Sequence, residues 1–315
     1  MTKFAIVFPG QGSQFVGMGR GLSEAYPVAA RAFEEANDAL GFDLGAIAFG
    51  GPAAELDRTE YTQPALLAAS IAALRVLNER APVVPDFYAG HSLGEYTALV
   101  AAGAIAFKDA VRIVHLRGRF MQEAVPAGFG RMCAVIGLDI DEVASVCAAA
   151  STGESVAVPA NINSPQQIVI SGHAAAVDRA AGLAKEKGAK RVIVLQVSAP
   201  SHSPLMESAA LRLGEELAGI AWSPFAVPVV SNVEAESMRD AAAVKGLLMR
   251  QLTSPVRWVD VIRKMRADGV GRILEAGPGK VLTGLIKRIE PDIVTFNMGE
   301  PADVEKAVEA MSCGR

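Results

Sequence analysis

The chain has 315 residues, of which 51% are hydrophobic and 20% charged, and its formal net charge is −4. This length supports one large domain or two unequal ones, and the composition is that of a globular protein rather than a disordered one. A mildly acidic chain has no general basic field to hold a nucleic-acid backbone, so no nucleic-acid partner is expected. The three cysteines, Cys133, Cys147 and Cys313, suit neither a disulfide framework nor a zinc site.

The first apolar run, Phe4 to Phe8, is too short for a secretory signal and is followed at once by Pro9-Gly10. We interpret it as a buried strand. No stretch approaches the roughly 18 unbroken apolar residues that a membrane span needs. Together with the cysteine content, this predicts a cytoplasmic protein without a membrane partner or a bound metal.

Short apolar runs alternate with longer helical patterns along most of the chain. This alternation is typical of parallel strands with helices on both faces of the sheet, so the predicted fold class is α/β, with an α/β-hydrolase-like parallel-sheet body. The predicted strands of this body are residues 4–8, 87–89, 227–230 and 272–275, and the predicted helices include residues 96–102, 108–125 and 205–217.

The segment from about Gly130 to Ser198 departs from that alternation. It contains a strand at 132–136, a helix at 141–150, strands at 156–161 and 167–171, a helix at 174–187 and a strand at 192–197. This β-α-β-β-α-β order is the ferredoxin-like one. We therefore predict a large α/β catalytic subdomain, residues 1–126 and 199–315, with a small ferredoxin-like subdomain, residues 127–198, inserted between hinges at 125–128 and 198–200.

The motif Gly90-His-Ser-Leu-Gly94 lies between a predicted strand and a predicted helix. This is the setting of a nucleophile elbow, a sharp turn that needs glycine on both sides of a serine and pushes its hydroxyl outward. The helix N-terminus adds backbone NH groups and a positive dipole end where an oxyanion would form. Ser92 is thus the candidate nucleophile. The alternative is a helix cap, because Glu95 completes a capping-box pattern with Ser92.

A serine nucleophile needs a base, and the chain offers four histidines. His91 adjoins Ser92, where neighbouring side chains diverge, His115 falls on the polar face of a helix, and His173 opens a helix of the small subdomain. His202 remains, in a loop after a predicted strand, where sites in α/β proteins gather. A hydrolase triad would need an Asp or Glu between the serine and the histidine in chain order. The acids found there lie on a helix (Asp109 and Glu123) or in the small subdomain, so a Ser-His dyad is predicted.

One arginine interrupts an apolar helix face. Arg117 falls among Val111, Val114 and Phe120 on the inner arc of the predicted helix 108–125, whereas other basic residues lie on the opposite face. A buried guanidinium is costly unless it meets an anion. The sequence leaves two alternatives open, a structural ion pair and a receptor for a substrate carboxylate.

The glycine-rich run Gly10-Gln11-Gly12 follows the first strand but matches neither the dinucleotide fingerprint nor the P-loop. We interpret it as a second source of backbone NH for an oxyanion hole, which needs close backbone approach.

Taken together, these residues resemble the malonyl-CoA:acyl carrier protein transacylases of the dissociated bacterial fatty-acid synthases. The resemblance covers nearly the whole chain. It rests on Phe8-Pro-Gly-Gln-Gly-Ser-Gln14, Thr62-Gln-Pro-Ala65, Gly90-His-Ser-Leu-Gly-Glu95, Arg117-Gly118 with Met121-Gln122, Pro200-Ser-His202, Ser254-Pro-Val-Arg-Trp258 and Glu275-Ala-Gly-Pro-Gly-Lys280.

The resemblance implies a ping-pong transfer of a malonyl group from malonyl-CoA to the phosphopantetheine thiol of acyl carrier protein, in support of fatty-acid synthesis. It implies Ser92 as nucleophile and His202 as base. It also implies the backbone NH groups of Gln11 and Leu93 as oxyanion donors, Arg117 as the carboxylate receptor and the backbone carbonyl of Gln251 as the group that orients the histidine. No cofactor is implied, because malonyl-CoA is a substrate and the partner carries the phosphopantetheine.

Several alternatives stay open. A serine thioesterase or esterase would pass the acyl group to water, and Ser201 beside the histidine leaves branched malonyl groups as alternative substrates. A chain with a relic site could also be a non-catalytic carrier-docking module. Two basic clusters could meet an acidic carrier protein, although a solvated charged face is the preferred explanation for both: Lys185, Lys187, Lys190 and Arg191, and Lys287 with Arg288.

Overall fold

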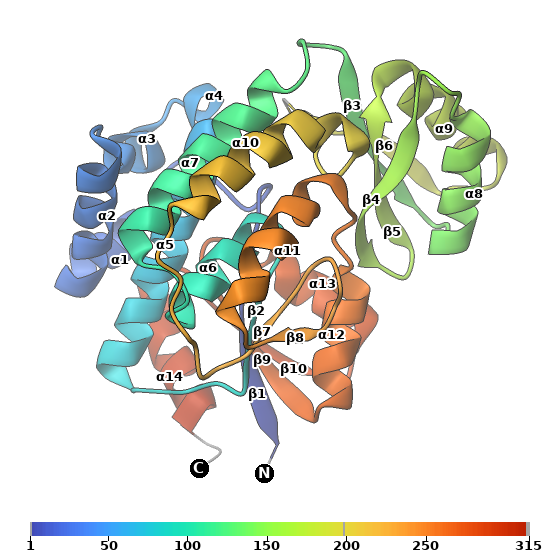
Figure 1. The fold of residues 1–315 in the computed structure, drawn as a ribbon. Helices are drawn as coiled ribbons and strands as arrows, with labels where there is room; N and C mark the ends of the chain where they lie inside the picture. Colours follow the sequence, from blue (N-terminus) through green and yellow to red (C-terminus); the bar gives the residue numbers. More distant parts are fainter. Residues whose placement is uncertain (1, 198, 313–315) are drawn as a thin grey trace.

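A six-stranded sheet forms the centre of the larger subdomain in the computed structural model, which describes residues 2–197 and 199–312 (Figure 1). The strand order is β10-β9-β1-β2-β7-β8, and every pairing is parallel except that of β7 with β8. Ser198 of the predicted exit hinge and Cys313 lie outside the described residues. The strands are β1 (Lys3–Phe8), β2 (Phe87–Gly90), β7 (Val229–Val230), β8 (Ser237–Met238), β9 (Val270–Ala276) and β10 (Val294–Met298).

Alternate residues of the central strands enter two separate apolar clusters. Ile6 and Phe8 pack into the cluster on one face, whereas Ala5 and Val7 pack into the cluster on the other. In a parallel sheet covered on both faces, the sequence of each strand is a continuous apolar run, which is why Phe4 to Phe8 could be predicted as a strand. The parallel α/β body is thus confirmed.

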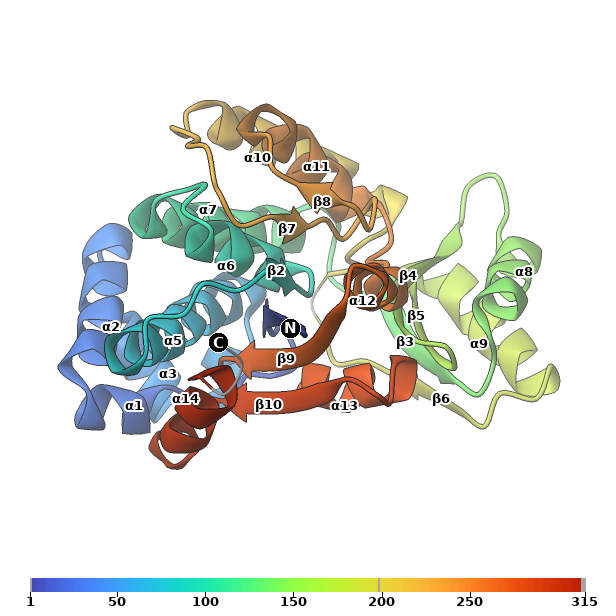
Figure 2. The same ribbon diagram turned by 90° about the horizontal axis from the view of Figure 1, so that it is seen from below.

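Helices cover both faces of this sheet. Figure 2 shows α5 on one side of the strands and α12 and α13 on the other. The longest, α5, is buried along most of its length. The helices before the small subdomain are α1 (Arg20–Ala25), α2 (Pro27–Leu40), α3 (Leu44–Gly50), α4 (Ala53–Leu56), α5 (Thr59–Arg80), α6 (Leu93–Ala101) and α7 (Phe107–Glu123). Those after it are η1 (Pro204–Met206), α10 (Glu207–Ala218), α11 (Ala241–Thr253), α12 (Trp258–Ala267), α13 (Val281–Ile289), η2 (Pro301–Asp303) and α14 (Val304–Ser312).

The inserted segment forms a second sheet with its own core. Its strands are antiparallel in the order β4-β5-β3-β6, and Val135, Val143, Ile168 and Val177 are buried between this sheet and two helices. The order along the chain is the predicted β-α-β-β-α-β. Its elements are β3 (Gly130–Ile136), α8 (Ile140–Ala150), β4 (Ala157–Ser164), β5 (Gln167–His173), α9 (Ala174–Glu186) and β6 (Arg191–Val194). The predicted limits of the two subdomains stay predictions.

Two strands are shorter than the sequence indicates. The strand predicted over 192–197 ends at Val194, because the chain beyond Leu195 leaves the sheet and lines a pocket. The strand predicted over 227–230 begins only at Val229. Pro228 precedes it and has no NH to donate to a sheet, although its carbonyl accepts from the Tyr88 NH at 2.9 Å.

Strand β4 joins the small subdomain to the body. Asn161 forms a parallel bridge with Val256, in which the Ile162 NH donates to the Val256 carbonyl at 2.9 Å and the Val256 NH donates to the Ala160 carbonyl at 2.9 Å. The yellow-green subdomain in Figure 1 therefore lies against the segment that leads into α12. Asn161 of this bridge also lines a pocket together with residues of the body.

The turn from β2 to α6 brings three backbone segments together. A Cβ atom added to Gly90 would lie 2.0 Å from the Gly94 carbonyl, and one added to Gly94 would lie 2.1 Å from the Phe8 carbonyl oxygen. No side chain fits at either position. The predicted need for glycine on both sides of Ser92 is thus a packing requirement of β1, β2 and α6.

Gly94→Ala should therefore lower the free energy of unfolding by about 3 kcal/mol, because the new methyl group overlaps backbone atoms that cannot move aside. Gly182→Ala is the matched control, since Gly182 lies in α9 with open space around it and should change stability by less than about 1 kcal/mol. Urea unfolding of both variants measures the difference. Equal stability of the two would contradict the close packing of the elbow.

Candidate active site

Ser92 occupies the tip of the turn between β2 and α6. Its backbone has φ 51° and ψ −104°, a strained conformation for a residue with a side chain, and strain of this kind gathers at functional sites. The Ser92 hydroxyl lies 2.8 Å from Nε2 of His202 and forms no capping bond to α6. The helix-cap alternative is therefore wrong. Glu95, its supposed capping partner, is buried and hydrogen-bonded to other groups.

Asn232 holds the turn in place. Its Oδ1 accepts from the Ser92 NH at 2.7 Å, and its Nδ2 donates to the Gly90 carbonyl at 2.7 Å. These two bonds satisfy backbone groups that the sharp turn leaves without helix or sheet partners. No sequence pattern indicates this role of Asn232. The available signal was its place just after β7, at the same carboxyl edge of the sheet as Ser92.

His202 is fixed by both ring nitrogens. Nδ1 donates to the Gln251 carbonyl at 2.7 Å, which leaves Nε2 without a proton and facing the Ser92 hydroxyl. The residue is 2% exposed and has φ 60°. Burial, and next the nearby positive charge of Arg117, lower the pKa of His202 to about 3. The imidazole is therefore neutral at physiological pH and able to accept a proton.

The other three histidines have partners elsewhere. His91 Nε2 lies 2.8 Å from Asn163 Oδ1 in the small subdomain, His115 Nδ1 lies 2.9 Å from the Glu60 carbonyl, and His173 Nδ1 accepts from the Val156 NH. His91 lines the same pocket as Ser92, but its ring nitrogen points to the small subdomain. Excluding the other three histidines on sequence grounds and examining the contacts in the structure thus both single out His202 as the candidate base.

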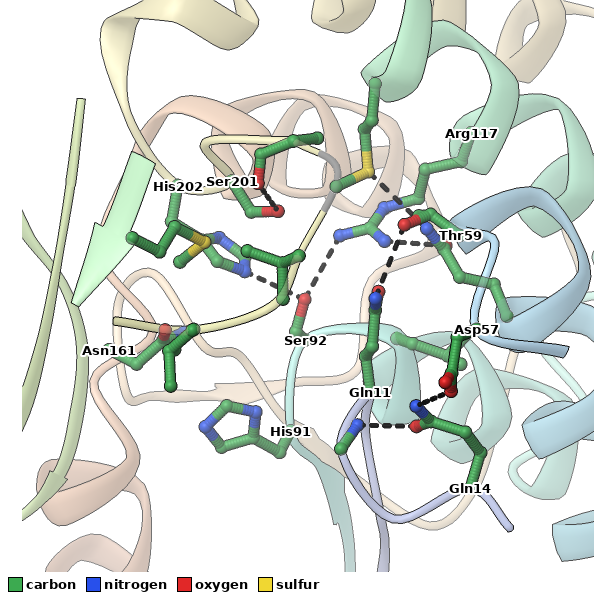
Figure 3. A pocket seen from close by; sticks show the side chains of 18 of the residues that line it. Gln11, Gln14, Asp57, Thr59, His91, Ser92, Arg117, Asn161, Ser201 and His202 are labelled. Carbon is green, nitrogen blue, oxygen red and sulfur yellow. Dashed lines mark hydrogen bonds between the residues drawn. The ribbon is translucent and has the colours of Figure 1, made fainter. Parts of the chain in front are cut away.

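Arg117 points from α7 toward the serine (Figure 3). It is 1% exposed, and its Nη2 donates to the Ser92 hydroxyl at 3.1 Å. Its other partners are neutral: Nη1 donates to Gln63 Oε1 at 2.6 Å, and Nη2 donates to Gln251 Oε1 at 3.0 Å. Burial lowers the pKa of the guanidinium.

The contacts of Arg117 distinguish a structural ion pair from a receptor for a substrate carboxylate. No carboxylate forms an ion pair with it in residues 2–197 and 199–312, so the structural ion pair is wrong for this part of the chain. Amide oxygens hold the guanidinium without neutralising it. What remains is a buried cation beside a serine hydroxyl, an arrangement suited to a ligand that carries its own negative charge.

Two backbone NH groups near Ser92 are available to donate hydrogen bonds. Gln11 follows β1 and Leu93 begins α6, and both residues line the pocket. Within the described residues, neither NH donates to another part of the chain. The packing of Gly94 on the Phe8 carbonyl brings these two segments together. Such a pair of free donors can stabilise an oxyanion.

The pocket lies between the two subdomains. The body contributes the reactive groups, and the small subdomain and the chain that leaves it supply Met132, Asn161, Leu195 and Val197. No group of three or more metal-ligating side chains that could hold an ion occurs in the described part of the chain. The full lining is Gln11, Gly12, Gln14, Asp57, Thr59, Gln63, His91, Ser92, Leu93, Arg117, Met121, Met132, Asn161, Leu195, Gln196, Val197, Ala199, Ser201 and His202.

All six predicted site residues therefore meet at one place. Ser92, His202, Arg117, Gln11 and Leu93 line the pocket, and Gln251 lies directly behind His202. Gln63 was part of a quoted motif, but its contact with Arg117 was not foreseen. The catalytic roles of these residues stay predictions at this point.

Comparison with known proteins agrees with this geometry. Residues 5–292 match the acyl transferase domain. A malonyl CoA-acyl carrier protein transacylase of Salmonella typhimurium is 51% identical over 308 residues, which cover 98% of this chain and 99% of that protein. The corresponding protein of Bacillus subtilis is 49% identical and is covered to 98%, with 99% of this chain aligned.

Solved structures show the same fold. An acyl carrier protein S-malonyltransferase from Vibrio cholerae has a TM-score of 0.94 at 49% identity and covers 97% of this chain and 100% of that one. A malonyl-transacylase solved in complex with a type II PKS acyl-carrier protein has a TM-score of 0.96 at 47% identity, covering 98% of this chain and 100% of that one. The chain belongs to the acyl transferase domain family and, within it, to the malonyl CoA-acyl carrier protein transacylases.

Proposed function

We propose that this protein transfers a malonyl group from malonyl-CoA to the phosphopantetheine thiol of acyl carrier protein through a malonyl-Ser92 intermediate. The observation that carries the proposal is the buried guanidinium of Arg117, which contacts the Ser92 hydroxyl and forms no ion pair in the described residues. The names of the relatives and the solved complex of one of them with its carrier protein support the same reaction.

In the first half-reaction, the Ser92 oxygen attacks the thioester carbonyl of malonyl-CoA while Nε2 of His202 takes the hydroxyl proton. The carbonyl oxygen becomes an oxyanion, which accepts hydrogen bonds from the NH groups of Gln11 and Leu93. Its collapse breaks the carbon–sulfur bond. CoA leaves as a thiol with the proton that His202 had taken, and malonyl-Ser92 remains.

The second half-reaction runs the same steps in reverse with a different thiol. His202 takes the proton of the phosphopantetheine thiol, whose sulfur attacks the malonyl-Ser92 ester. The oxyanion forms at the same NH groups. When it collapses, Ser92 leaves and recovers its proton from His202. No net proton is gained or lost, and the hydrogen bond from His202 Nδ1 to the Gln251 carbonyl keeps the ring in one tautomer throughout.

Arg117 supplies the substrate preference. A malonyl carboxylate can accept two parallel hydrogen bonds from the guanidinium, whereas an acetyl group would leave the buried cation unpaired. Methylmalonyl carries the same carboxylate, so Arg117 alone does not separate malonyl from branched malonyl groups. A panel of acyl-CoA substrates with carrier protein, read by intact mass, separates them.

The described chain supplies nucleophile, base, oxyanion donors and carboxylate receptor, and we propose that the reaction uses no cofactor. No helix in the described residues is long and apolar enough to cross a membrane. A cytoplasmic location is part of the proposal. It is supported by the free thiols of Cys133 and Cys147, which are buried in the small subdomain and suit a reducing compartment.

The thioesterase alternative differs only in the acceptor of the malonyl group. Malonyl-CoA is incubated with the protein, with and without holo acyl carrier protein. Transfer predicts malonyl carrier protein and little free malonate, whereas a hydrolase releases malonate in both reactions. A non-catalytic docking module would form no covalent malonyl protein at all.

Ser92→Ala should abolish covalent attachment of the malonyl group, because among the described residues Ser92 is the one whose hydroxyl lies within hydrogen-bond distance of His202 Nε2. Intact-mass analysis after incubation with malonyl-CoA reports the adduct. Ser201→Ala is the control, since Ser201 lines the pocket without contacting His202 Nε2, and it should still be acylated. A malonyl adduct on the Ser92→Ala protein contradicts the assignment of the nucleophile.

Arg117→Ala should lower kcat/KM for malonyl-CoA roughly 10³-fold and change the much lower value for acetyl-CoA far less, since only malonyl loses a charged partner. Arg119→Ala is the matched control on the same helix, where the side chain is 46% exposed and weakly paired with Glu123. It should leave both values unchanged. An equal loss for both substrates in Arg117→Ala would rule out a carboxylate receptor.

The depressed pKa of His202 predicts an unusual pH profile. A base with a pKa of about 3 is neutral throughout the range from pH 5 to 8, so the rate at which an uncharged serine-reactive phosphonofluoridate labels Ser92 should stay flat there. The rate should fall only as the pH drops toward 3. His202→Ala should label slowly at every pH. A half-maximal rate between pH 6 and 7 would show that the imidazole is not depressed.

A further inference from the structure

One buried carboxyl at the site has no part in the mechanism above. Glu95 lies in the first turn of α6 and is 1% exposed. Its Oε2 accepts from Gln251 Nε2 at 2.6 Å and from the Asn232 NH at 3.3 Å, whereas its Oε1 has no hydrogen-bond partner among the residues that the structure describes. Both donors are neutral, and a buried carboxylate held only in this way is costly.

The side chain of Gln251 links this carboxyl to the buried cation. Its Oε1 accepts from Arg117 Nη2 at 3.0 Å, while its Nε2 donates to Glu95. Arg117 and Glu95 are thus joined through one amide but form no direct ion pair within the described chain. In an interior with little water, opposite charges joined through one amide still attract each other, and the charge of Arg117 lowers the pKa of Glu95, although less than the hydrogen bonds from Gln251 and Asn232 do. The ionisation of Glu95 therefore depends on how much positive charge Arg117 presents to it.

The other groups around Glu95 do not compete for this role. Asn232 and Gln251 carry no charge, and burial raises the pKa of Tyr96, whose ring lies 5.4 Å from the guanidinium, to about 12. Burial also lowers the pKa values of His202 and His91, so both rings are neutral. Burial raises the pKa of Glu95 to about 7 against the opposing pull of its hydrogen bonds and Arg117. Among the described groups named here, Glu95 is the one whose pKa lies near neutral pH.

We propose that Glu95 takes up one proton from solvent when a malonyl carboxylate binds Arg117. This rests on the proposed function of Arg117 as carboxylate receptor. The ligand's negative charge neutralises the cation that had stabilised ionised Glu95 and adds repulsion, so the neutral acid becomes the favoured form. Glu95 is a positioning residue, because it acts on the substrate through Gln251 and Arg117. Malonyl binding is then stronger at lower pH.

The test uses the full chain with Ser92→Ala, which binds malonyl-CoA without reacting. Calorimetric titrations in two buffers of different ionisation enthalpy at pH 7 should show an uptake of about half a proton per malonyl-CoA bound. Acetyl-CoA carries the same CoA phosphates and should show none. Between pH 6 and 8, the Kd of malonyl-CoA should rise roughly tenfold, as loss of one proton with a midpoint near 7 requires.

Adding Glu95→Gln tests the residue. The amide oxygen can keep the hydrogen bonds of Oε2, so malonyl-CoA should still bind, with no proton uptake and a Kd that no longer changes with pH. Uptake that persists in this variant overturns the proposal. Should the double variant fail to fold, infrared difference spectra of the Ser92→Ala protein provide the readout. A protonated carboxyl band should appear with malonyl-CoA and not with acetyl-CoA, and its absence also overturns the proposal.

The outcomes separate this inference from the function on which it rests. If malonyl-CoA binds no more tightly than acetyl-CoA, Arg117 is not a carboxylate receptor and the proposed function fails first. If malonyl-CoA binds much more tightly without any proton uptake, the proposed function stands and the coupling to Glu95 is wrong.

Discussion

The close approach of three backbone segments at Gly90, Gly94 and Phe8 is the constraint on which the site depends. Because Gly90 and Gly94 have no Cβ atom, the start of α6 can lie directly against the end of β1. The same approach places the amides of Gln11 and Leu93 beside one serine and forces that serine into a strained conformation. Steric packing of the sheet thus assembles groups that are more than 80 residues apart in the sequence.

Neutral amides organise the charges around this turn. Asn232 binds the backbone of the elbow, Gln63 binds Arg117, and Gln251 contacts His202, Arg117 and Glu95 at once. An amide can donate and accept together, so it orients charged neighbours without cancelling their charge. A carboxylate in the place of Gln63 would orient Arg117 equally well, but it would neutralise the cation that we propose as the receptor for the malonyl carboxylate.

The sequence alone predicted the α/β body, the order of the inserted elements and the elbow at Ser92, because each depends on a local pattern or on short-range sterics. Apolar runs marked β1 and β2, and paired glycines marked the turn. It did not predict Asn232, the contact of Gln63 or the buried state of Glu95, whose spacing from Ser92 looked like a capping box. These contacts join α5 to α7, and α6 to α11 and to the chain after β7, and no local pattern records which side chains meet across such distances.

The pocket is divided between two folding units. Every residue that we assign to bond making or charge recognition belongs to the large subdomain. Met132 and Asn161 of the small sheet only line the pocket. Substitutions at these wall residues can therefore change the shape of the pocket without changing the residues proposed to carry out the reaction. A family built in this way can diversify its substrates without having to reinvent its chemistry.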